Sequence, residues 1–403
     1  MNKKPFLIIV CIVAYLFVFF LTPKTAYADE ISASENTSSD LTKAYEYLYE
    51  QVEKLLNGID LSGLEQEFSN FEIFEQKGSA KDIILNLING DYKIDYGKFF
   101  QNLLNLFFSD LSGLWASFAV IVSVAILGSI INSLKSGTNI GSVGEVWHFV
   151  SMTVIIAMVS VMFSSVYIST KKSIEGLGRQ CDAFLPLLLT LMVAGGGSVS
   201  ASVYKPQVAF FTKVLWQIVN NLLLPIVLLI YLFNAVGFLS DKFNLERTKS
   251  FLKSTFKWIT GLSVVVFNFF VTAQGLTSSA FDGVSIKALK YALGNSVPLV
   301  GNLVSGGFDV VFASILLIKN AVGSFALILI LITVLMPVLK IGAFSLFLRF
   351  ASAIIEPISD KKLSGFLSGV ADGAGYVSTV CIVGASSYFI TILLIICSLG
   401  GGV

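Results

Sequence analysis

Apolar stretches of about the length that a bilayer requires follow one another from residue 111 onward, with few charges inside them. A transmembrane α-helix needs about 20 consecutive apolar residues. The pattern therefore indicates an all-α, polytopic membrane protein. The clear spans are predicted at 114–134, 147–169, 214–239, 258–280, 321–339 and 376–399.

Two further apolar segments, 184–203 and 297–318, are shorter and interrupted. The first begins near Pro186 and the second near Pro298, and each carries glycines midway. Backbone freed at such a break is tolerated in a membrane only where protein or water covers it. Both segments are therefore predicted to be broken or re-entrant helices that face the protein interior, which gives six to eight transmembrane helices in all. The glycines are Gly195, Gly196, Gly197, Gly306 and Gly307.

The two interrupted segments predict an internal duplication. A shift of 112 residues without a gap superposes Pro186 on Pro298 and Gly195 on Gly307, with repeat units of about 147–240 and 258–352. If the interrupted segments cross the bilayer, the halves are inverted, as in many transporters. If they are re-entrant, the halves are parallel. The positive-inside rule slightly favours a cytoplasmic position for the basic residues between 242 and 257.

The N-terminus carries the pattern of an exported protein. Lys3 and Lys4 precede an apolar run at 6–21, and Ala26-Tyr27-Ala28 follows, which is typical of a cleaved signal peptide. An uncleaved first helix is the alternative. The predicted organisation is a signal peptide at 1–28, an extracytoplasmic region at 29–110 and a transmembrane domain at 111–403.

Composition and charge divide the chain further. Hydrophobic residues make up 55% and charged residues only 13%, about half the charged share of a soluble domain. Residues 29–110 hold 16 acidic side chains against six lysines, whereas the following part holds 10 acidic and 18 basic ones. Apolar steps of three and four between 41 and 59 predict an amphipathic helix there. The exported acidic region is thus expected to be small and helical, either a cap on the membrane domain or a docking surface.

The chain offers little for catalysis. His148 is its single histidine, the cysteines lack C-x-x-C spacing, and the Gly195–Gly197 run lacks the Lys-Ser/Thr that would follow in a phosphate-binding loop. We expect no enzymatic activity, no cofactor and no metal site. Active movement of a cargo would require a separate ATPase or an ion gradient.

Ionisable groups near apolar segments are the default functional candidates. Asp309 lies inside the second interrupted segment and Lys319 follows it, so Asp309 lies near the interface, pairs with Lys319 or gates a pore. Arg349 and Glu356 are seven residues apart, on one face of a helix, and are predicted to brace helix packing. The candidate pore or gate residues are Pro186, Gly195, Gly196, Gly197, Pro298, Gly306, Gly307, Asp309 and Lys319.

The run Phe-Leu-Pro-Leu-Leu-Leu-Thr-Leu-Met-Val-Ala-Gly-Gly-Gly at 184–197 resembles the signature of the stage III sporulation protein AE family of endospore-forming bacteria. Similar matches occur at 298–301, 314–323, 347–350 and 356–360, and the plan of signal peptide, exported region and multi-pass domain also agrees. The resemblance covers the whole chain and is strongest from Cys181 to Asp360. The acidic region adds little to it.

The resemblance implies a multi-pass protein of the mother cell, placed in the outer forespore membrane during sporulation. It implies a role in a secretion-like channel complex that joins mother cell to forespore and supports late forespore gene expression. The implied partners are other membrane proteins of that complex, a cytoplasmic secretion-type ATPase and a forespore protein across the intermembrane space. The family supplies no catalytic residue.

Two mechanisms fit this role. In the first, the membrane domain is a conduit whose interrupted segments line and gate a path. In the second, it is a scaffold that holds partners in register. Outside sporulation, the predicted duplication also fits a secondary transporter or permease for a small solute.

Overall fold

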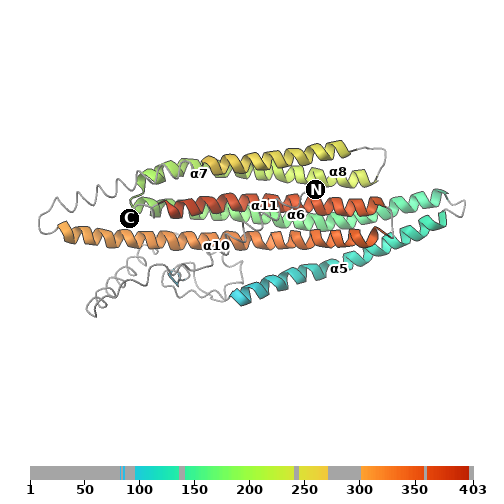
Figure 1. Cartoon of the computed structure of the whole chain (residues 1–403), viewed down its shortest axis with the longest axis horizontal. Helices are drawn as coiled ribbons and strands as arrows, with labels where there is room; N and C mark the ends of the chain where they lie inside the picture. The colour runs from blue at the N-terminus through green and yellow to red at the C-terminus, as the bar shows by residue number, and fades with distance from the viewer. Residues whose placement is uncertain are drawn as a thin grey trace. The chain divides into compact units, whose positions relative to one another are not determined.

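The computed structural model describes residues 82, 85–86, 96–135, 141–239, 245–270, 301–357 and 361–398. Within these ranges the chain is helical apart from short turns, so the all-α prediction is confirmed for this part (Figure 1). The predicted signal peptide, most of the acidic region and Pro298 lie outside the described residues. The helices are α5 (Tyr96–Lys135), α6 (Gly141–Ala194), α7 (Ser198–Ile218), the π-helix η1 (Val219–Leu223), α8 (Leu224–Leu239), a helix at 246–270, α10 (Gly301–Ile355) and α11 (Lys361–Cys397).

Helices α10 and α11 pack side by side and antiparallel along most of their length (Figure 1). Near their connection the Ser352 hydroxyl donates to the carbonyl oxygen of Ser364 at 2.9 Å. At the far end Lys319 Nζ donates to the carbonyl oxygen of Ile396 at 2.8 Å. Residues earlier on α10 therefore meet residues later on α11, as in a helical hairpin.

Helix α6 completes a three-helix core with this pair. The Ser173 hydroxyl donates to the carbonyl oxygen of Thr333 on α10 at 2.7 Å, and the Phe184 and Phe325 rings meet edge to face with centroids 5.9 Å apart. Both aromatic side chains are fully buried. Close packing of this kind is what holds helices together in lipid, where helix contact brings little hydrophobic gain.

The remaining helices pack around this core through aromatic contacts. Tyr231 of α8 stacks on Phe163 of α6 with ring centroids 4.2 Å apart, and its hydroxyl shares a hydrogen bond with Ser160. The Phe118 ring of α5 stacks on Phe350 of α10 at 5.7 Å. The helix at 246–270 reaches α11 through Phe256, whose ring lies 5.0 Å from that of Tyr376.

Pro225 accounts for the π-helix between α7 and α8. Proline lacks a backbone N–H and its ring clashes with the carbonyl four residues earlier. One turn before it the backbone widens, and the Leu224 N–H donates to the carbonyl of Val219, five residues back. A π-bulge of this kind absorbs the proline without ending the run of helix.

Only one of the two predicted helix breaks is present. The chain leaves helix at Gly195–Gly197, with Gly196 at a φ of 80°, and reverses to begin α7. In contrast, Gly306 and Gly307 lie within continuous α10, so the break predicted at these two glycines of the 297–318 segment is wrong. A helical glycine costs only about 1 kcal/mol relative to alanine, which the packing of a 55-residue helix overcomes.

Two predicted loops are also helical. Residues 170–183 belong to α6, which passes through Pro186 without a break, and residues 340–355 belong to α10. The predicted span at 147–169 and the first part of the interrupted segment predicted at 184–203 therefore belong to one helix. The charged residues alone had indicated loops here, but charged residues are compatible with the exposed surface of a helix.

Four helices in the described part are long and apolar enough to cross a membrane: Phe149–Ala194, Lys213–Leu239, Ile315–Ile355 and Lys362–Cys397. Six to eight spans are thus not confirmed, although 214–239 is reproduced closely. Helix α6 has 54 residues, about 81 Å at 1.5 Å per residue. A hydrocarbon core is about 30 Å thick, so part of α6 extends beyond it unless the helix is strongly tilted.

We predict that Gly323→Ala weakens the contact between α10 and α11. A Cβ added at Gly323 would overlap the Ile396 side chain, whereas one added at Gly342, also on α10, meets nothing within 4 Å. Overpacking typically costs about 1–3 kcal/mol, and alanine gains about 1 kcal/mol of helix propensity at the open site. Thermal unfolding in detergent should place the first variant below wild type and the second at or above it. Equal stability of the two variants would contradict the close approach.

Candidate functional site

Lys319 is a fully buried lysine at the far end of the three-helix core. Its Nζ donates to the carbonyl oxygens of Ile396 at 2.8 Å and Ile395 at 3.3 Å. The last carbonyls of a helix have no amide partner within the helix, and its C-terminus carries a partial negative charge. The ammonium therefore caps the end of α11 from the side of α10.

The ends of α6 and α11 meet next to this cap. Ser398 donates to the carbonyl oxygen of Ile395 at 2.8 Å and lies 3.7 Å from the sulfur of Met192, near the end of α6. Tyr204 of α7 is buried close by, and burial first, then the Cys397 thiolate, raises its pKa to about 12. Its phenol therefore stays protonated at physiological pH. This buried cluster is polar but holds no carboxylate among these residues.

The predicted gate residues divide into two groups. Gly195–Gly197 form the turn after α6, and the Gly197 N–H donates to Met192, so this turn lies at the same end of the core as Lys319. Asp309 lies ten residues before Lys319 on continuous α10, about 15 Å along the axis, which is beyond the reach of a direct ion pair. Gly306 and Gly307 lie farther still, and Pro186 is an exposed residue within α6.

The predicted brace involves a different partner. Arg349 donates from Nη2 to Asp372 Oδ1 at 2.6 Å and so joins α10 to α11. Glu356 is exposed in the turn that follows α10. The arginine thus links two helices instead of two turns of one helix. Because both partners are partly exposed, the pair contributes at most about 1 kcal/mol.

A second feature is a charged stripe on the outside of α6. Its members are all exposed: two adjacent lysines come first, and an acidic, a basic and an acidic residue follow at three- and four-residue steps. They are Lys171, Lys172, Glu175, Arg179 and Asp182. We call these five residues the α6 charged face.

The α6 charged face differs sharply from the surface on either side of it. The helix carries no charged residue at 149–169 or at 183–194, and Val161 is 72%, Ile168 48% and Val193 51% exposed there. Charged side chains in a spanning helix almost always face water or protein. The change therefore marks the place where the surface of α6 ceases to suit lipid.

Sequence reasoning missed this face because the charges were assigned to a loop between two spans. The available signal was the spacing itself, since opposite charges three and four residues apart support a helix. A helix through residues 170–183 joins the two predicted apolar segments and places the five charged residues on one face.

The core also contains polar atoms that its helices leave unmatched. Gln180 Nε2 donates to Thr333 Oγ1 at 2.7 Å, but Gln180 Oε1 and the hydroxyls of Ser387 and Tyr388 are buried with no hydrogen-bond partner in the structure. Unpaired buried polar atoms cost free energy. Within the described ranges, no three His, Cys, Asp or Glu residues are grouped so as to hold a metal ion.

Taken together, long apolar helices around a packed core define a multi-pass helical membrane protein. The family model for stage III sporulation protein AE matches residues 78–400. The chain therefore belongs to the stage III sporulation protein AE family and is a sporulation protein, as its motifs indicated.

A curated relative supports the same assignment. The stage III sporulation protein AE of Bacillus subtilis (strain 168) is 21% identical over 318 residues, which cover 79% of this chain and 80% of the relative. No solved structure matches the chain.

We predict that Lys319→Met loosens the end of α11. Methionine fills a similar volume but leaves the Ile396 carbonyl without its donor, and a lost hydrogen bond to a charged group costs about 1.5–3 kcal/mol. Thermal unfolding in detergent should show a lower midpoint, with faster proteolysis after Cys397. The exposed Lys213→Met serves as a matched control. Wild-type stability of Lys319→Met would show that the cap is dispensable.

Proposed function

We propose that this protein is a scaffold within a channel complex that joins the mother cell to the forespore and supports late forespore gene expression. It would reside in the outer forespore membrane and hold partner proteins in register. Family membership supports a place in sporulation. The α6 charged face is the observation that favours the scaffold mechanism.

The interior of the described core argues against a path through a single copy. Phe163, Phe184, Phe325 and Phe344 are each at most 2% exposed and fill the space between α6, α8, α10 and α11. The candidate gate at Gly306 and Gly307 is continuous helix. The conduit mechanism depends on interrupted helices that line a water-filled path. The packed phenylalanines and the continuous α10 helix do not match this requirement.

The α6 charged face instead provides a surface that a protein partner can recognise. Charge complementarity across an interface sets register and suppresses wrong partners. The alternation of basic and acidic groups gives this face polarity along the helix, so a partner with the opposite pattern is held in one alignment. The expected partners are the other membrane proteins of the complex, a cytoplasmic secretion-type ATPase and a forespore membrane protein.

We predict that exchanging two charges, Glu175→Arg with Arg179→Glu, abolishes partner recruitment. The exchange keeps the net charge and the four-residue spacing within α6, so the helix changes by only about 0.2–0.5 kcal/mol. A partner would instead meet like charges, which costs several kcal/mol. Sporulating cells should retain the protein in membranes at wild-type levels, fail to co-purify its partners and form far fewer heat-resistant spores.

The control is Lys205→Gln, which alters an exposed charge on α7 and should sporulate normally. Normal sporulation of the exchanged variant would show that the α6 charged face does not dock a partner. Retained partners with failed sporulation would contradict the scaffold mechanism and favour a conduit.

A further inference from the structure

The charges of the α6 charged face follow one another at regular steps along one side of the helix. Lys172, Glu175, Arg179 and Asp182 are separated by three, four and three residues, alternate in sign and are all exposed. At about 1.5 Å per residue these steps measure about 4.5, 6 and 4.5 Å along the axis. Steps of three and four residues keep the four side chains on one side. The face therefore presents four charges in a fixed order over about 15 Å.

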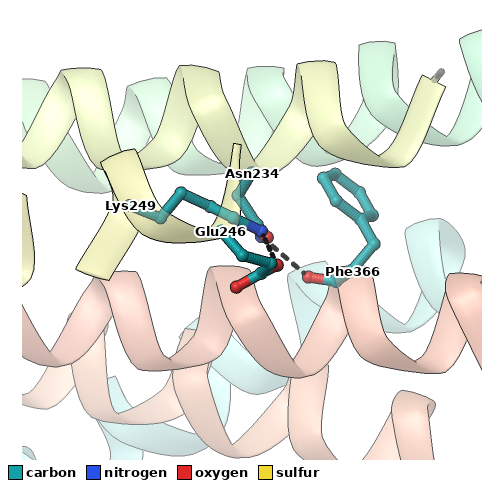
Figure 2. Close-up of polar contacts among 4 residues, drawn as sticks. All are labelled: Asn234, Glu246, Lys249 and Phe366. Carbon is teal, nitrogen blue, oxygen red and sulfur yellow. Dashed lines mark hydrogen bonds and ion pairs between the residues drawn. The ribbon is translucent and has the colours of Figure 1, made fainter. Parts of the chain in front are cut away.

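The α6 charged face differs from a charged contact that lies between helices of the chain. Glu246 forms an ion pair with Lys249, which lies over the last turns of α8 (Figure 2). In contrast, no ion pair joins Lys172, Glu175 or Asp182 to another helix within the part of the chain that the structure describes. These charges therefore lie on the outer surface of α6, where a partner can reach them.

The spacing of the four charges fits a helix as the partner. A second helix presents residues at steps of three, four and three on one side over the same distance of about 15 Å. Each charge of α6 can then lie opposite one charge of the partner. A strand presents every second residue on one side, about 6.6 Å apart, so four such residues cover about 20 Å. A strand therefore loses register with the α6 charged face.

The order of the signs disfavours a second copy of this chain in the same orientation. Two copies inserted in one membrane in the same sense bring Lys172 opposite Lys172 and Glu175 opposite Glu175, and like charges across an interface are costly. An antiparallel helix with the order basic, acidic, basic, acidic instead brings an acidic residue opposite Lys172 and a basic residue opposite Glu175. The macrodipoles of two antiparallel helices also attract each other.

We propose that the α6 charged face binds an antiparallel helix of a different protein, in which a basic, an acidic, a basic and an acidic residue follow at steps of three, four and three. The charges of that helix lie opposite Asp182, Arg179, Glu175 and Lys172, in that order. This inference rests on the scaffold function proposed above, because it identifies the class of partner that the docking surface accepts.

The test uses the purified full chain in phosphatidylcholine nanodiscs and two alanine-based helical peptides of about 20 residues. Both peptides carry two lysines and two glutamates at steps of three, four and three. The matching peptide has the order Lys, Glu, Lys, Glu, and the reordered peptide has the order Lys, Lys, Glu, Glu, with the same composition and net charge. A carbodiimide joins carboxylates to amines that lie against them, and mass spectrometry identifies the joined residues.

The wild-type chain should capture the matching peptide about tenfold more than the reordered one. The reordered peptide turns two of four exposed attractive pairs into repulsive ones, and tenfold corresponds to about 1.4 kcal/mol. The first lysine of the matching peptide should be joined to Asp182, as the antiparallel orientation requires. High salt should reduce the preference.

The matched variant is Glu175→Arg with Arg179→Glu, whose face has the order basic, basic, acidic, acidic. It should capture the reordered peptide and not the matching one. A difference in helicity between the two peptides cannot produce this reversal, because each peptide is preferred by one protein. The control Lys205→Gln changes an exposed charge on α7 and should keep the wild-type preference.

Capture of both peptides to the same extent, or of neither, would overturn the helical partner. A carbodiimide link between Lys172 and Asp182 of two chains in native membranes would assign the face to a second copy and overturn it as well. The scaffold function fails separately, if the exchanged variant keeps its partners and sporulates normally. Lost partners in cells without peptide selection would keep the docking surface and reject only the helix.

Discussion

The antiparallel contact between α10 and α11 is the interaction on which the positions of the other helices depend. Helix α6 lies against both members of the pair, α5 packs on α10, and α8 packs on α11 through Phe238 and Phe366, whose rings stack at 4.6 Å. Close approach is possible because Gly323 has no side chain where Ile396 packs. Lys319 then supplies donors to the carbonyls that the end of α11 leaves without partners. In lipid, small residues allow two helices to approach closely, and polar groups form hydrogen bonds between them.

The sequence predicted correctly that the elements are helices, but it predicted less accurately where each helix begins and ends. Hydropathy located the candidate span Lys213–Leu239, which runs from the end of α7 through η1 to the end of α8, almost to the residue because that span ends where charges begin. It divided α6 and α10 wrongly because charges and glycines were interpreted as ends of helices. Whether Lys171 or Gly306 interrupts a helix depends on what packs against it, which local sequence does not contain. Gly195–Gly197 did end a helix, since three successive glycines allow the positive φ that the turn uses at Gly196.

The same limit applies to the candidate site. Lys319 was identified because a lysine in an apolar segment is costly and usually functional, but its partners lie 76 and 77 residues away. Arg349 was paired with Glu356, seven residues away on the same helix face, whereas its partner Asp372 lies across the hairpin on α11. Spacing along one helix predicts local pairs only. Predicting contacts between helices requires knowing which residues of α10 lie opposite which residues of α11, and the sequence alone did not show this.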